Sequence, residues 1–268
     1  MHPPVKNTFM AFTESFEGGA AIDWMFLDVL GRVGTAFGID LDFNGSGPSP
    51  SVEISRQQGL PKAKALQWVF RNTSRSADDN AVALEWETIK SKPSGPQYGA
   101  GWFKQFTKLQ LTRASMVDRV QSLLTSNERV LKASPAFKDF EQWPADGQLA
   151  VLGLSWNGVG HLTGNTQGTL QNPRAFRDAC EKQDFLAAAA LSKMVASATN
   201  DSIRRRSEAQ RQLLLNAAAV VEAETYTRVI YQRPVLYYPT ILTSPLLWGL
   251  GKRLERDFGV VLNGLRIP

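Results

Sequence analysis

Two carboxylates near the N-terminus, Glu17 and Asp28, are the residues of this sequence best spaced for chemistry. Glycoside hydrolysis needs one protonated acid to give a proton to the leaving oxygen and one ionised carboxylate to activate water. The chain has 25 acidic residues, so a solvated Glu at a helix end and an Asp in a turn explain the spacing equally well. Glu14 is the reserve acid, because it lies three residues before Glu17 and close to the same helix face.

Four short motifs follow one another along the chain. They are Phe16-Glu17-Gly18 followed by Phe26-Leu27-Asp28 with Gly31, Thr35 and Gly38; ADGQLAVLGLSWNGVG at residues 145–160; DFLAAAA at residues 184–190; and Arg205-Arg206-Ser207-Glu208 continuing to Leu213. Together, over about residues 7–222, they resemble the motifs of phage-type lysozymes, the muramidases of the lysozyme-like superfamily. The resemblance stops before the last 45 or so residues.

This resemblance implies a fold, an activity and a set of site residues. The fold is α+β and mainly α, with a small N-terminal lobe holding a short β-hairpin region, a C-terminal helical bundle and a C-terminal arm. The activity is cleavage of the β-1,4 bond between N-acetylmuramic acid and N-acetylglucosamine in peptidoglycan, with inversion. The implied catalytic residues are Glu17 as general acid, Asp28 acting on the water and Thr35 positioning it; the implied substrate-binding residues are Trp24, Phe37, Asn157 and His161.

The chain departs from the family pattern at three places. Residues 20–23 lengthen the segment between the two carboxylates, and Ile39 replaces a common His or Asn. The family's catalytic Thr aligns with Gly34, and Thr35 is its neighbour. Because successive side chains of a strand point to opposite faces, this offset would aim Thr35 away from the cleft unless a bulge intervenes.

Composition is that of a globular protein large enough to bury a full core, with 268 residues of which 43% are hydrophobic. The sequence has no run of about 18 apolar residues, so we expect no membrane-spanning helix. The first residues lack an apolar signal-peptide core, so we expect synthesis in the cytoplasm and action in the periplasm or on the cell wall after lysis or another secretion route. With Cys180 as the one cysteine and two histidines, we expect no disulfide, no metal and no cofactor.

A net charge of +5 and a pI near 9.4 favour an anionic partner. We expect the protein to bind peptidoglycan glycan strands, and we expect neither nucleic-acid binding nor stable membrane insertion. A delivery machinery or an immunity protein is expected as a further partner. The expected oligomeric state is a monomer. Two other functions stay open. One is a non-catalytic, lysozyme-like protein that binds glycan or belongs to a phage or secretion apparatus. The other is a hydrolase of chitin or chitosan.

The hydrophobic pattern predicts the elements that would position this site. We expect three parts: a catalytic lobe over residues 1–110, a helical lobe over 111–224 and an arm over 225–268. Residues 145–157 are apolar nearly all round and predict the central buried helix, with Trp156 in the core. Other helices are expected at about 7–17, 61–72, 78–91, 112–133, 173–182, 184–197 and 202–223, a hairpin over 24–42, loops at 44–51, 91–101 and 157–169, strands or an extended segment over 226–240, and a helix over 246–258.

Overall fold

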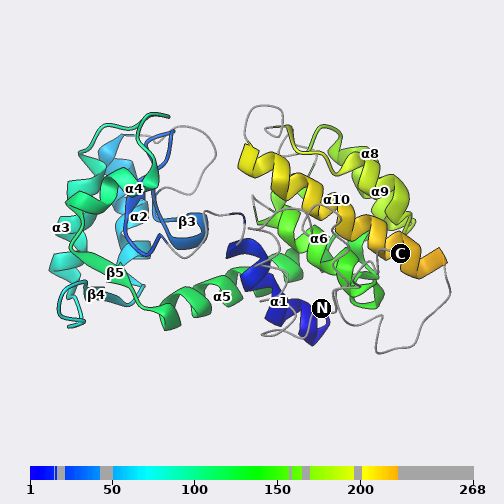
Figure 1. Ribbon diagram of the computed structural model, residues 1–268, viewed down its shortest axis with the longest axis horizontal. Coiled ribbons are helices and arrows are strands. Elements are labelled where there is room, and N and C mark those ends of the chain that lie inside the picture. The colour runs from blue at the N-terminus through cyan, green and yellow to red at the C-terminus, as the bar shows by residue number, and fades with distance from the viewer. Residues whose placement is uncertain are drawn as a thin grey trace, which may run out of the picture. The chain divides into compact units, whose positions relative to one another are not determined.

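The computed structural model describes residues 1–14, 16, 22–42, 51–156, 159–164, 170–195 and 201–222, with the side chains of 201 and 202 left aside. Over these residues the fold is mainly helical α+β with small antiparallel sheets (Figure 1). The fold class expected from the sequence is therefore confirmed at this level. The expected loop at 44–50, the arm at 225–268 and the site residues Glu17 and Asn157 lie outside the described residues.

Contacts divide the chain into two compact units. We call Glu17–Val120 the sheet unit, and Met1–Phe16 together with the residues from Gln121 onward the bundle unit. The helix α1 (Pro3–Glu14) is thus part of the bundle unit, although the sequence analysis grouped residues 1–110 in one lobe. The boundary falls inside α5 (Arg113–Lys132), the long helix expected over residues 112–133.

The sheet unit begins with a three-stranded antiparallel sheet, which confirms the hairpin expected over residues 24–42. Its strands, in the order β1-β2-β3, are β1 (Phe26–Leu27), β2 (Val33–Thr35) and β3 (Ile39–Asp40), and the short 3-10 turn η1 (Ala36–Gly38) joins the last two. The remaining elements of this unit, before α5, are α2 (Val52–Lys64), β4 (Trp68–Phe70), α3 (Asp79–Lys90), α4 (Ala100–Phe103), η2 (Lys104–Phe106) and β5 (Leu109–Leu111).

One helix prediction in the sheet unit is wrong. Residues 61–72 do not form a helix: α2 ends at Lys64, and Trp68–Phe70 is a strand paired antiparallel with β5. Pro61 lies inside α2, whose N-cap is Ser51, rather than at a helix start. The strand depends on β5, about forty residues later, and local periodicity carries no information on such a partner.

The helix α3 anchors the three-stranded sheet. Asp78 caps it by accepting a hydrogen bond from the amide of Ala81, as the expected start near residue 78 requires. Trp86 is completely buried, and its indole N–H donates to the carbonyl of Leu41 at 2.8 Å. Gly59 of α2 packs so closely on Leu41 that an added Cβ would lie 2.3 Å from its carbonyl oxygen. Both helices therefore hold the end of β3 in place.

The bundle unit is built around α6 (Ala145–Ser155), in which every residue is buried. This confirms the central buried helix. The helix packs against α1 and against α10 (Asp201–Glu222), and the other elements are η3 (Pro135–Phe137), η4 (Phe140–Gln142), α7 (Gly160–Thr163), α8 (Pro173–Glu181) and α9 (Phe185–Leu191). Trp156, however, is only half-buried at the end of α6, with its ring 5.5 Å from that of Phe9. The aromatic core of this unit includes Trp143 instead, which is 1% exposed.

Two further predictions for the bundle unit need correction. The helix expected over 184–197 ends at Leu191, because Met194 leaves the helix to form a β-bridge with Leu170. The loop expected over 157–169 contains α7, so His161 lies on a short helix. Asn172 and Asp184 cap α8 and α9 through their side chains.

Candidate functional site

The turn between β1 and β2 holds Asp28. Its Oδ1 accepts hydrogen bonds from the amides of Leu30 at 2.8 Å and Arg32 at 2.9 Å. Its own amide donates to the carbonyl of Arg32 at 2.9 Å, and Gly31 completes the turn with a φ of 75°, a conformation that glycine adopts without strain. Oδ2 makes no hydrogen bond within the described part of the chain, so the turn uses one carboxylate oxygen and leaves the other open.

Strand register separates Asp28 from Thr35. Phe26 pairs with Gly34 and Gly34 with Asp40, whereas Leu27 pairs with Val33 and Thr35 with Ile39. Side-chain alternation therefore places Asp28 on the face of Phe26, Gly34 and Asp40. Thr35 lies on the opposite face, where it is completely buried and its hydroxyl donates to the carbonyl of Trp24 at 3.1 Å.

Gly34, which aligns with the family's catalytic Thr, has no hydroxyl to offer. A Cβ built at this position would lie 3.3 Å from the ring of Phe26, so the neighbouring aromatic side chain covers the space. On the face that carries Asp28, neither residue 34 nor residue 35 presents a hydroxyl group. Neither residue could therefore position a water molecule beside Asp28 through a hydroxyl group.

An ion-pair network fixes the hairpin to α3. Lys90 donates to the carboxylate of Asp42 at 2.5 Å and to the carbonyl of Gly31 at 2.9 Å, and Asp42 also accepts from the amide of Val33 at 2.9 Å. Burial raises the pKa of Asp42, but the hydrogen bonds from Lys90, Ser55 and Val33 outweigh it, so the pKa is lowered. Lys90 of α3 thus holds the turn that carries Asp28 in place.

Asp40 is a carboxylate that the sequence analysis did not single out. It lies on the Asp28 face of the sheet, pairs with Arg32, and accepts a hydrogen bond from the amide of Asp42 at 2.7 Å. The amide of Arg32 binds Asp28 while its guanidinium binds Asp40, so one residue links both carboxylates. The sequence did carry a signal for Asp40. Residues 39–42 alternate between apolar and acidic side chains, and this alternation places Asp40 and Asp42 on one side of a strand.

The aromatic residues expected to bind substrate differ in exposure. Trp24 is half-buried, its indole N–H donates to the carbonyl of Ala100 at 2.9 Å, and the ammonium of Lys104 lies 4.7 Å from its ring centre. Phe37, within η1, is only 4% exposed and adopts a φ of 58°, which is unusual for a bulky residue. In this structure Phe37 packs in the core, and Trp24 is the aromatic residue of the pair that solvent reaches.

The remaining candidates are in the bundle unit. His161 is half-buried on α7, and its Nδ1 is buried with no hydrogen-bond partner among the described residues. Glu14, the reserve acid, is the last residue of α1 and is 8% exposed. The described part of the chain therefore brings Asp28, Thr35, Trp24 and Phe37 together around one small sheet, and leaves His161 and Glu14 in the other unit.

The described residues were also considered for metal binding and for membrane spanning. Within the described residues no cluster of three or more His, Cys, Asp or Glu side chains could hold a metal ion. No helix in the same set of residues has the length and hydropathy to cross a membrane. Comparison of the chain with known protein families, with characterised proteins and with solved structures found no match.

Proposed function

We propose that this protein is a peptidoglycan hydrolase of the muramidase type. The observation that carries the proposal is the Asp28 carboxylate, which the β1–β2 turn orients through Oδ1 while Oδ2 stays open. The motif resemblance over about residues 7–222 assigns the partner acid to Glu17. The short sheet around Asp28 and the buried central helix of the bundle unit also support the proposal.

The proposed reaction uses the two carboxyl groups in opposite protonation states. Glu17, protonated, gives its proton to the glycosidic oxygen as the bond from the anomeric carbon breaks. Oδ2 of Asp28, ionised, accepts a proton from the water whose oxygen bonds to that carbon. Two carboxyl groups about 6.5 to 9.5 Å apart leave room for this water and give inversion.

The direct experiment measures reducing ends released from purified peptidoglycan, with chitosan as a parallel substrate. We expect release from peptidoglycan by the unaltered protein and a loss of more than about 100-fold in Glu17→Gln, the low end for removal of a general acid. Glu14→Gln is the matched control and should retain activity. Loss in Glu14→Gln with activity kept in Glu17→Gln would move the acid to Glu14, and release from chitosan alone would change the substrate.

A second function, non-catalytic glycan binding, is favoured by one specific observation. The Asp28 face of the sheet lacks the hydroxyl that the resemblance implies, because residue 34 is Gly and the hydroxyl of Thr35 is buried. Sedimentation of the protein with insoluble peptidoglycan, without release of reducing ends, would support this function over hydrolysis.

A further inference from the structure

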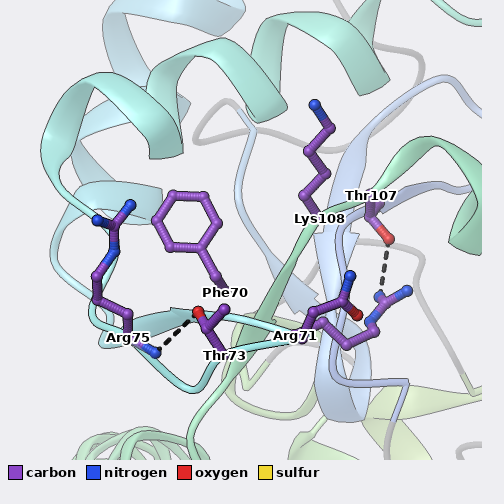
Figure 2. Close-up of a pocket in the computed structure, with 7 residues that line it drawn as sticks. Phe70, Arg71, Thr73, Arg75, Thr107 and Lys108 are labelled. Atoms are coloured by element: carbon purple, nitrogen blue, oxygen red, sulfur yellow. Dashed lines mark hydrogen bonds between the residues drawn. The ribbon is translucent and has the colours of Figure 1, made fainter.

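A basic pocket lies in the sheet unit, at the C-terminal end of β4. It has a volume of about 590 Å³, within the range of about 300 to 1,000 Å³ typical of small-molecule sites. The end of β4, the residues just after it and the residues just before β5 form its walls (Figure 2). The lining residues are Phe70, Arg71, Asn72, Thr73, Arg75, Thr107 and Lys108.

The pocket is positively charged. Arg71, Arg75 and Lys108 line it, and the described residues that line it include no acidic side chain. Glu85 of α3 lies behind the wall, where its carboxylate accepts hydrogen bonds from the amides of Lys108 at 2.6 Å and Leu109 at 3.0 Å. One buried carboxylate against three lining cations leaves an excess of two positive charges at this place.

Arg71 is held in a fixed position. One guanidinium nitrogen, Nη2, donates to the hydroxyl of Thr107 at 2.8 Å (Figure 2). The guanidinium carbon lies 5.6 Å from the ring centre of Trp24. Its Nε is buried and has no hydrogen-bond partner among the described residues. Because a buried donor without a partner is costly, Arg71 keeps capacity for an acceptor that the described residues do not supply.

The opposite wall combines an apolar ring with a second cation. The guanidinium of Arg75 lies 5.1 Å from the centre of the Phe70 ring, and its backbone amide donates to the hydroxyl of Thr73 at 3.4 Å. In Figure 2 the guanidinium of Arg75 lies on one side of the Phe70 ring and Lys108 on the other. The pocket thus offers charge at its edges and an apolar surface between them.

We propose that this pocket binds a phosphate monoester whose organic group packs against Phe70. A monoester carries about 1.5 to 2 negative charges near neutral pH, which matches the excess of positive charge, whereas a carboxylate carries one. Arginine side chains suit phosphate oxygens because their donors form a planar fork. The volume of about 590 Å³ exceeds what a phosphate group fills, so the ligand includes an organic portion. This proposal does not depend on glycan cleavage.

Calorimetric titration of the full chain at pH 7.5 and low salt tests the ligand class. The probes are phenyl phosphate, inorganic phosphate, dimethyl phosphate and benzoate. We expect phenyl phosphate to bind most tightly and inorganic phosphate more weakly, because the latter lacks a group for Phe70. Benzoate or dimethyl phosphate binding as tightly as phenyl phosphate would overturn the proposal, since each carries a single charge. Absence of phenyl phosphate binding would overturn it as well.

Variants locate the binding in this pocket. Arg75→Gln and Lys108→Gln each remove an exposed charge, and we expect each to weaken phenyl phosphate binding about tenfold, a typical effect of losing one charge-assisted contact. Lys138→Gln, which removes an exposed charge in the bundle unit, is the matched control and should bind like the unaltered protein. Equal weakening in Lys138→Gln, or no weakening in Arg75→Gln with Lys108→Gln combined, would place the phosphate elsewhere.

Discussion

The proposed hydrolysis gives the carboxyl group of Asp28 two roles, and the two can be separated by substitution. Oδ1 holds the β1–β2 turn through two backbone amides, and Oδ2 is the oxygen available to a water molecule. An amide side chain in place of the carboxyl group keeps an oxygen that can accept both amide hydrogen bonds. A methyl side chain in the same place loses both hydrogen bonds. Residue 28 therefore allows a structural role and a chemical role to be measured independently.

We predict that Asp28→Asn retains the melting temperature and loses at least about 100-fold in glycan cleavage, because it keeps the turn but cannot accept a proton. Asp28→Ala should also lose about 1 kcal/mol of stability, the usual effect of removing hydrogen bonds at a half-buried position. Thermal unfolding and release of reducing ends from peptidoglycan measure the two effects. Full activity in Asp28→Asn would restrict Asp28 to the turn.

Thr35 gives the opposite expectation. Its hydroxyl is buried and donates to the carbonyl of Trp24, so its contribution is to the stability of the hairpin. Thr35→Val keeps the shape and removes the hydrogen bond, which should cost about 1 kcal/mol in unfolding free energy and leave cleavage within about twofold. Thr35→Ser is the control that keeps the hydroxyl. A large loss of cleavage in Thr35→Val at unchanged melting temperature would return Thr35 to the catalytic set.

At the scale of elements, the pair of Asp42 and Lys90 joins the hairpin to α3. Asp42 is completely buried, and the side chain of Lys90 is 6% exposed. A buried pair of this kind is costly to break from one side, because the remaining charge loses its counter-ion at a place that solvent does not reach. The pair also binds the carbonyl of Gly31, so the same contact controls the turn that carries Asp28.

Lys90→Met should therefore destabilise the protein by about 3 to 5 kcal/mol at pH 7. Lys132→Met is the matched control. Nζ of Lys132 lies 2.5 Å from Oε1 of Glu141, but the two side chains are 38% and 60% exposed. Exposed ion pairs contribute about 0 to 1 kcal/mol to stability. Chemical unfolding of both variants provides the comparison. A loss of less than about 1 kcal/mol in Lys90→Met would show that the hairpin is held by packing alone.

The pH dependence of the same pair follows from the sign of the shift. The folded-state pKa of Asp42 is lowered below its ordinary value of 3.8, so its contribution to stability is fully present above that value. It is lost as pH falls from about 4 through the lowered folded-state pKa, because in this range the unfolded chain binds a proton at Asp42 that the folded protein does not bind. We predict that the difference in stability between the unaltered protein and Lys90→Met narrows over this acid range, as measured by chemical unfolding at a series of pH values.

At the scale of the whole molecule, the bundle unit is assembled from two separate stretches of chain. The helix α1 supplies Val5 and Phe9, both completely buried, to a core whose other helices begin more than a hundred residues later. Contacts between α1 and α6 join these two parts. The sheet unit, between them in sequence, has its own core around Trp86.

Phe9→Ala should therefore destabilise the bundle unit by about 3 to 5 kcal/mol, as expected for deletion of a fully buried aromatic side chain. The amides of the sheet unit should keep their protection from hydrogen exchange. Hydrogen exchange followed peptide by peptide can show this, with faster exchange in α6 and α10 and little change in α3. Equal acceleration in α3 would mean that the two units unfold together.

The sequence by itself determined the features that depend on near neighbours. Helical periodicity located α3 and the long helix α5, Asn172 followed by Pro173 marked the start of α8, and an all-apolar segment identified α6 as the buried helix. It also indicated that Thr35 is one position out of register for a role beside Asp28. These signals are local, because a helix closes its hydrogen bonds within four residues and a strand alternates its side chains at every residue.

Only the tertiary structure decided the features that depend on distant partners. The strand at residues 68–70 exists because β5 pairs with it, and α1 joins the bundle unit because its buried side chains meet α6. The ion pair of Asp42 with Lys90 and the basic pocket around Arg71 each combine residues far apart in the sequence. Burial and charge proximity are properties of such contacts in space, and no local pattern of residues encodes which distant segment will supply the partner.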